Sequence, residues 1–416
     1  MNNHKILKAA CYTSNLSMSV VCNLSPLLFL TFRTLYGISF SLLGALVLIN
    51  FFTQLLVDLL FSFFSHKMNI TLSVKIMPVL AAVGLIVYAS VPVIFPSAVY
   101  LGLVIGTVIF SAASGLNEVL ISPIIAEIPA ENPDHEMSKL HSVYAWGVVA
   151  VAVVSTLFLL IFDDHKWQYL AYIFAAIPVV SAVLFSLCEI PEMKTPEKSS
   201  GALAFMKNRG VWICVLAIFL GGAVECTMAQ WASGYLEQAL GLPKALGDVF
   251  GVAMFAATLG FGRTLYTRIG KSPTGVVLWG AVGAAVCYAV AIFSPFPIVG
   301  LLACGATGFF ASMLWPGNIL ISSDRYPEGG VIMYALMASG GDLGAALGPQ
   351  LVGVIADFTS ESSAMARLAD ALSVGTDVLG MKAGMLIGLL FALCAIPLYA
   401  SFHRAARVKK ETKKVN

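Results

Sequence analysis

Residues 38–64 read ISFSLLGALVLINFFTQLLVDLLFSFF and contain a single charged side chain, that of Asp58. A bilayer core about 30 Å thick requires roughly 20 consecutive apolar residues in each spanning helix, so this stretch is long enough to cross a membrane. The rest of the chain has the same character, because 59% of its residues are hydrophobic and only 11% are charged. Soluble domains carry about 25% charged residues. The sequence therefore predicts an integral membrane protein.

Similar apolar stretches follow one another along the chain, separated by short polar connections. Twelve spans are predicted, at residues 9–32, 38–64, 74–95, 98–127, 139–162, 167–188, 209–234, 246–266, 273–293, 296–323, 329–357 and 380–403. Backbone N–H and C=O groups must find partners inside lipid, so each span is expected to be an α-helix. The predicted fold class is an all-α membrane protein with twelve transmembrane helices.

The basic residues are distributed unevenly between the two sides of these spans. With the N-terminus inside, 19 of the 24 Lys and Arg residues lie on the inner face or its edge, as the positive-inside rule requires. We therefore predict a multi-pass protein of the cytoplasmic (inner) membrane with both termini in the cytoplasm. The net charge of +2 is spread over short loops and one tail. It indicates membrane lipids rather than nucleic acid as partners, and a monomer is expected.

The chain also divides into two halves. The longest inner polar stretch, EIPEMKTPEKSSGALAFMKN at 189–208, follows the sixth span. The sequence Leu-Ile-Ser occurs at 120–122 in the fourth span and again at 320–322 in the tenth. Repeated six-helix units of this kind are typical of secondary transporters. We predict an N-terminal six-helix bundle at 1–188, a cytoplasmic central linker at 189–208, a C-terminal six-helix bundle at 209–404 and a cytoplasmic basic tail at 405–416.

Three motifs resemble those of the Major Facilitator Superfamily of transporters. They are GFGRTLYTRIGK at 260–271, its partial counterpart QLLVDLLFSFFSHK at 54–67, and the glycine-rich SGGDLGAALGPQLVG at 339–353. The resemblance covers essentially the whole chain. It implies two pseudo-symmetric six-helix bundles that alternate access to a central cavity. It also implies that the loop residues gate this cavity, and the residues expected to do so are Asp58, Arg263, Arg268 and Lys271.

Within this superfamily, Glu118 and Pro123 in the fourth span resemble the Glu-x-x-x-Asn-Pro pattern of the fucose permease group. The resemblance implies sugar transport with Glu118 as the proton-coupling acid. Acids inside a span are costly and face a cavity or a partner, so Glu225 and Asp342 are further candidates for coupling. A sodium ion or uncoupled, facilitated transport remain alternatives to the proton.

Aromatic and amide side chains at mid-span are suited to a sugar, which offers apolar C–H faces for stacking and hydroxyls for hydrogen bonds. The polar face of residues 50, 54 and 58, spaced four apart, is also suited to lining water. The predicted cavity residues are Asn23, Asn50, Gln54, Tyr144, Trp146, Gln230, Trp231, Trp315 and Asn318.

Enzyme function is not expected, because the sequence contains no phosphate-binding loop, no His-Glu-x-x-His zinc motif and no Gly-x-Ser-x-Gly elbow. No cofactor is expected beyond a coupling proton or sodium ion. The leading prediction is a secondary carrier of a small polar solute, such as a sugar. The alternatives are an exporter of amphipathic drugs and a membrane sensor that does not transport.

Overall fold

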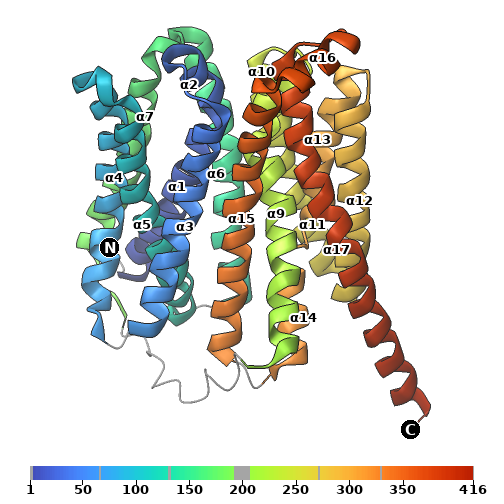
Figure 1. The fold of residues 1–416 in the computed structure, drawn as a ribbon. Coiled ribbons are helices and arrows are strands. Elements are labelled where there is room, and N and C mark those ends of the chain that lie inside the picture. Colours follow the sequence, from blue (N-terminus) through green and yellow to red (C-terminus); the bar gives the residue numbers. More distant parts are fainter. Residues whose placement is uncertain are drawn as a thin grey trace. The chain divides into compact units, whose positions relative to one another are not determined.

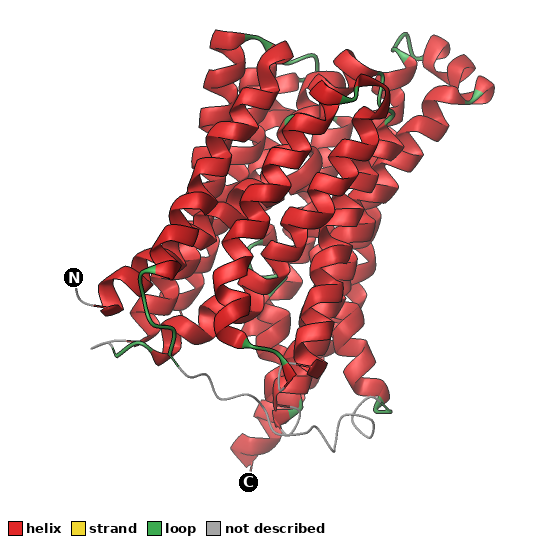
Figure 2. Ribbon diagram, turned by 90° about the vertical axis from the view of Figure 1, so that its left-hand side faces the viewer, coloured by secondary structure: helices red, strands yellow, loops and turns green. Residues whose placement is uncertain are grey.

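A computed structural model of the 416-residue chain describes residues 3–64, 67–129, 133–191, 207–269, 272–327 and 330–415. Nearly all of these residues are helical (Figure 2). The chain divides into two compact units, Met1–Lys198 and Ser199–Asn416, which we call the N-terminal and C-terminal units. The predicted linker falls largely on residues 192–206, outside the described residues, so the finer division into bundles, linker and tail stays a prediction.

The N-terminal unit is built from seven described helices and two short 3₁₀ turns, at Pro96–Ala98 and Asp164–Lys166 (Figure 1). The helices are α1 (Asn3–Leu27), α2 (Phe29–Tyr36), α3 (Phe40–Phe64), α4 (Ile70–Ile94), α5 (Val99–Glu127), α6 (Pro133–Phe162) and α7 (Trp167–Ser186). Helix α5 packs on α3 and α4, while α1 packs on α6, α7 and α5.

The C-terminal unit contains the remaining helices, one of which is interrupted by a π-helical segment. In order they are α9 (Arg209–Gln238), α10 (Lys244–Leu246), the π-helix η4 (Gly247–Ala253), α11 (Met254–Ile269), α12 (Pro273–Phe293), α13 (Pro297–Ala311), α14 (Pro316–Arg325), α15 (Gly330–Glu361), α16 (Ser363–Ala371) and α17 (Thr376–Val415). Helix α9 packs along α15, and α17 packs on α12 and α15. The last turns of α17 extend beyond the other helices of this unit (Figure 1).

In the part of the chain that the structure describes, ten helical stretches are long and apolar enough to cross a membrane. An eleventh is added if α1 and α2, which meet at an angle of 46°, form one span. The protein is therefore a multi-pass membrane protein, but the predicted count of twelve is not confirmed. Helix α15 covers the predicted eleventh span with 32 residues. It is not among the ten.

Two predicted spans are interrupted within their length, and a proline lies at each interruption. Proline has no N–H and its ring clashes with the carbonyl four residues earlier, which kinks or ends a helix. The first span bends just after Pro26. The tenth span is interrupted between α13 and α14, and α14 begins at Pro316. The second break lies beside residues with candidate roles in function.

Candidate functional site

A row of polar side chains follows one face of α3 in the N-terminal unit and contacts α5. Asn50, Gln54 and Asp58 are spaced four apart and are all buried, as residues on one helical face would be. The Gln54 amide nitrogen donates to Asn50 Oδ1 at 2.9 Å. The Ser111 hydroxyl of α5 donates to the same oxygen at 2.7 Å. The predicted cavity residues Asn50 and Gln54 thus form one hydrogen-bonded polar seam between α3 and α5.

The seam ends at two carboxyl groups that were predicted to have different roles. Carboxylate oxygens of Asp58 on α3 and Glu118 on α5 lie within 4.8 Å of each other. Asp58 is buried, and its Oδ1 has no hydrogen-bond partner among the described residues. No ion pair joins either acid to a base within the described part of the N-terminal unit. We call Asp58 and Glu118 the acid pair.

The chemistry of the acid pair follows from its surroundings. Ionised groups inside a membrane cost several kcal/mol and need a partner. Two carboxylates this close repel each other when both are ionised, so one of them favours its protonated form or the pair attracts a cation. The pair is therefore suited to holding a proton or a monovalent cation.

Asn117, next to Glu118, has a role in helix packing that the sequence analysis did not identify. Its side-chain oxygen accepts from the Ser14 hydroxyl at 2.6 Å, and its amide donates to Asn15 Oδ1 at 3.2 Å. These bonds tie α5 to α1. The same region has a small, partly open pocket of about 10 Å³ lined by Ser14, Ser17 and Asn117, which is room for about one water molecule. In the sequence, the only signal for the packing role of Asn117 was its position as a strongly polar residue next to Glu118.

The other N-terminal candidates lie on α1 and α6. Asn23 is buried and donates to the Ser19 carbonyl at 2.9 Å, and the Ser19 hydroxyl donates to the Tyr144 carbonyl at 3.1 Å. Trp146 is 70% exposed. Asn23 therefore forms a bond within its own helix, whereas the Trp146 ring is largely uncovered. Contact of these residues with a solute stays a prediction.

At the polar end of α6, Glu136 links this helix to α1. The Tyr12 hydroxyl donates to Glu136 Oε2 at 2.7 Å, and Lys8 Nζ lies 3.0 Å from Oε1. Glu136 precedes the apolar stretch of α6, which begins at Ser142. The hydrogen bond from Tyr12 and the contact with Lys8 favour the ionised form and hold the pKa of this carboxyl below its usual range. The contact of Glu136 with Tyr12 and Lys8 therefore links α6 to α1 in a way that depends on pH.

In the C-terminal unit, the structure brings together two candidates that were predicted separately. Arg263 of α11 lies 3.1 Å from the Glu225 carboxylate of α9, with the distance measured from Nη2 to Oε1. Arg263 Nε also donates to the Ser312 carbonyl at 3.1 Å. Of the other predicted gating residues, Arg268 lies in α11 but its side chain is outside the described part of the chain, as is Lys271.

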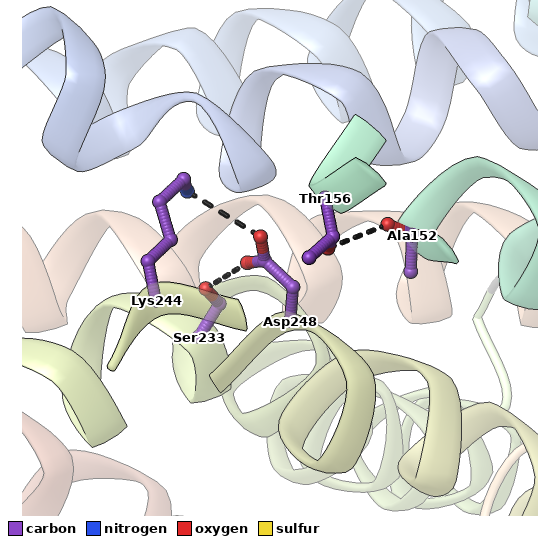
Figure 3. A network of polar contacts seen from close by, with 5 residues as sticks. All are labelled: Ala152, Thr156, Ser233, Lys244 and Asp248. Carbon is purple, nitrogen blue, oxygen red and sulfur yellow. Dashed lines mark hydrogen bonds and ion pairs between the residues drawn. The ribbon is translucent and has the colours of Figure 1, made fainter. Parts of the chain in front are cut away.

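A further buried acid of this unit, Asp248, was missed by the sequence analysis. It lies in the π-helix η4, where it accepts a short hydrogen bond from the Ser233 hydroxyl and faces Lys244 Nζ at 3.6 Å (Figure 3). Its side chain is fully buried. Single π-helical turns inside α-helices are frequent at functional sites. The signal available in the sequence was a Lys and an Asp spaced four apart at the start of an apolar stretch.

The remaining C-terminal candidates take part in helix packing. The Trp231 indole is fully buried and donates to the Pro349 carbonyl at 2.8 Å. The Asn318 amide donates to the Leu314 carbonyl at 2.6 Å and to the Tyr399 hydroxyl at 2.8 Å. Trp315 lies at the break between α13 and α14, where its ring borders two glycines. Gln230 and Asp342 are buried in α9 and α15. Their predicted contact with a solute or ion is untested.

Comparison with known proteins assigns the fold and the family. Residues 10–349 match the Major Facilitator Superfamily, and the chain belongs to this superfamily. The protein is therefore a membrane transporter of this superfamily. None of the curated proteins compared matches the sequence.

Several solved transporter structures share the fold at low sequence identity. The nucleoside transporter NupG is 15% identical, with 97% of this chain and 99% of that chain covered and a TM-score of 0.70. The E. coli xylose transporter XylE in an inward-open conformation is 16% identical, with 93% and 94% covered and a TM-score of 0.71. The E. coli fucose:proton symporter FucP is 15% identical, with 95% and 99% covered and a TM-score of 0.59. At these identities the likeness concerns the fold alone.

Proposed function

We propose that the protein is a secondary active transporter that moves a small polar solute, with a sugar as the leading class, by alternating access. We further propose that transport is coupled to a proton through Glu118, with Asp58 sharing that proton. The observation that carries the coupling is the acid pair, in which two carboxyl groups lie within 4.8 Å in membrane helices. No ion pair to a base compensates them in the described part of their unit. Such groups must take up a proton or a cation.

Sugar or nucleoside as the solute class is supported by two kinds of observation. The polar seam next to the acid pair presents amide and hydroxyl groups, which suit a solute rich in hydroxyls. Solved structures with the same fold include the fucose:proton and D-xylose–proton symporters and a nucleoside transporter. We propose the predicted cavity residues of both units as the solute site, and Arg263, Arg268 and Lys271 as gating residues.

We propose twelve spans, with α1–α2 and α15 among them, since α15 is 32 residues long and about 20 suffice for a span. The predicted domains, with bundles at 1–188 and 209–404, a linker at 189–208 and a tail at 405–416, are proposed together with them. We also propose that the protein lies in the cytoplasmic membrane, has both termini in the cytoplasm and is a monomer.

Uptake by proteoliposomes tests the proposal. The probes are radiolabelled D-xylose, L-fucose and uridine, each measured with and without an inward proton gradient and with a sodium gradient in parallel. We expect accumulation of at least one probe under the proton gradient. Accumulation driven only by the sodium gradient would overturn the proposal that transport is coupled to protons. Export of a cationic amphipathic dye with no uptake of any probe would overturn the solute class, and binding without flux would favour a sensor.

A further inference from the structure

The break between α13 and α14 leaves one backbone carbonyl without its helical donor. In an uninterrupted α-helix the carbonyl of residue i accepts from the N–H of residue i+4. The residue four positions after Ser312 is Pro316, which has no N–H. Residues 312–315 form a turn between the two helices. Ser312 is buried, so its carbonyl needs a donor from elsewhere.

Arg263 of α11 supplies this donor. Its Nε donates to the Ser312 carbonyl at 3.1 Å, while its Nη2 contacts the Glu225 carboxylate at 3.1 Å. The preceding residue, Gly262, allows the approach. A Cβ atom at Gly262 would lie 2.4 Å from Ser312 Oγ and 3.0 Å from the Phe309 carbonyl oxygen. The close packing of α11 against the end of α13 thus brings the guanidinium to the break.

Only arginine has the geometry for both contacts. The guanidinium is planar and carries five N–H donors in fixed directions, so one side chain serves a carbonyl and a carboxylate at the same time. A lysine amine is a single point charge on a flexible stem. Glu225 neutralises the charge that Arg263 brings into the membrane. The three groups form one arrangement, which we call the clamp: Glu225, Arg263 and the Ser312 carbonyl.

We propose that Arg263 is a positioning residue whose guanidinium replaces the N–H that Pro316 lacks, and that the clamp fixes the geometry of the α13–α14 break. The break carries Trp315, whose ring lies against Gly222 of α9 and Gly341 of α15. Fixing the break therefore fixes the orientation of Trp315. The clamp lies entirely within the C-terminal unit and is independent of which solute is carried. The effect on Trp315 as a solute contact rests on the proposed function.

Spin labels on the two helices report the geometry of the break directly. Leu302 on α13 and Leu320 on α14 are both exposed, and 18 residues of continuous helix would separate them by about 27 Å. Cysteines are introduced at these two positions in a cysteine-free background and spin-labelled. The distance between the labels is measured by pulsed electron–electron double resonance in nanodiscs. We expect one narrow distance distribution for the native clamp and a broader one for Arg263→Gln.

The decisive comparison is made in a Pro316→Ala background. That substitution restores the N–H at position 316, so the Ser312 carbonyl regains a helical donor and Arg263 becomes dispensable. We expect Arg263→Gln to leave the distance distribution unchanged there. Equal broadening in both backgrounds would overturn the proposal, because Arg263 would then act through something other than this carbonyl.

Two further variants distinguish loss of the clamp from a general weakening of the packing between α11 and α13. Arg263→Lys keeps the charge but loses the two-directional geometry, and we expect it to broaden the distribution as Arg263→Gln does. Thr258→Val is the matched control, because the Thr258 hydroxyl of α11 donates to the Gly305 carbonyl of α13 at 2.6 Å, away from the break. No broadening is expected for this control. Broadening by Thr258→Val, or full rescue by lysine, would contradict the proposal.

Transport kinetics provide the functional readout. For whichever of D-xylose, L-fucose or uridine the protein carries, we expect Arg263→Gln to raise KM about tenfold. In the Pro316→Ala background the same change is expected to leave KM at the background value. A KM raised equally in both backgrounds would contradict the role in positioning. If no probe is carried by the unmodified protein, the proposed function fails, while the spin-label distances still decide the clamp.

Discussion

The buried acids of the two units differ in what neutralises them. In the C-terminal unit, Glu225 pairs with Arg263 and Asp248 lies within 3.6 Å of Lys244. In the N-terminal unit, Asp58 and Glu118 lie close to each other, and the described part of that unit provides neither with an ion pair to a base. Both units place carboxyl groups inside membrane helices, but Glu225 and Asp248 each lie beside a base, whereas the described part of the N-terminal unit provides no base for the acid pair.

This difference assigns different tasks to the two units. A carboxylate paired with a base fixes the geometry of the helices it joins, because breaking a buried pair is costly. A carboxyl group without a base gains or loses a proton or a cation more readily. On this basis we propose that ion coupling lies in the N-terminal unit and that the C-terminal unit fixes the α13–α14 break.

The largest effect is expected at the acid pair. Glu118→Gln removes the titrating carboxyl without changing its size, so accumulation driven by a pH gradient should be abolished while exchange of labelled for unlabelled solute continues. Asp58→Asn should reduce accumulation strongly as well, because Glu118 then loses the carboxyl group with which we propose that it shares the proton. Both quantities are measured in proteoliposomes at equal protein density.

The double variant and a C-terminal control sharpen this test. Groups that share one proton act as a unit, so Asp58→Asn with Glu118→Gln should be no worse than Glu118→Gln alone. Glu225→Gln, in the compensated unit, should retain pH-driven accumulation. Loss of coupling in Glu225→Gln with coupling intact in Glu118→Gln would reverse the assignment of the two units.

Helix packing at glycine should matter in both units. A Cβ at Gly344 of α15 would lie 2.1 Å from the Phe219 carbonyl oxygen of α9, and one at Gly84 of α4 would lie 2.5 Å from the Phe110 backbone nitrogen of α5. Neither neighbour is a flexible side chain. Gly344→Ala and Gly84→Ala are each expected to lower the free energy of unfolding by about 1–3 kcal/mol.

The matched control for both is Gly375→Ala, where the nearest atom to a new Cβ, in Val378, is 3.8 Å away. Unfolding is followed by circular dichroism in mixed micelles. If Gly344→Ala or Gly84→Ala has the same free energy of unfolding as Gly375→Ala, the helices at that glycine can move apart at little cost.

A smaller loss of stability is expected when the compensated acid is removed. Glu225→Gln leaves Arg263 without its counter-charge, and breaking a fully buried pair costs about 3–5 kcal/mol. The Arg263 side chain is 41% exposed, so we expect a loss of about 1–2 kcal/mol. Exchanging the two residues, Glu225→Arg with Arg263→Glu, should recover part of it. No recovery would mean that orientation toward Ser312, rather than charge, dominates.

The smallest effect is expected at Glu136. Its folded-state pKa is lowered by Tyr12 and Lys8, so the contact stabilises α1 against α6 above the ordinary carboxyl pKa of 4.5 and is lost as the pH falls through the lower folded value. The protection of the first turns of α1 against hydrogen exchange, taken relative to the intrinsic exchange rate at each pH, should therefore fall at acidic pH. Glu136→Gln should remove this pH dependence, and an unchanged dependence in that variant would assign it to another group.

The membrane class and many polar positions followed from the sequence because they depend on local composition. Apolar length predicts spans regardless of tertiary contacts, and acids such as Glu118 and Glu225 stand out against an apolar background. Side-chain partners could not be predicted, because Arg263 meets Glu225 across 38 residues of sequence. Asp248 was overlooked because it lies at a span end, where charged residues are ordinary. The two breaks were missed although Pro26 and Pro316 were visible, since many membrane helices tolerate proline.

Infrared difference spectroscopy of the protein in lipid tests whether the acid pair holds a proton, because it detects protonated carboxyl groups without any solute. We predict that the unmodified protein at neutral pH shows a protonated carboxyl band that disappears in Glu118→Gln and shifts in Asp58→Asn, while Glu225→Gln leaves it unchanged. A spectrum without this band, or a band that survives in both N-terminal variants, would contradict the claim that the acid pair holds a proton.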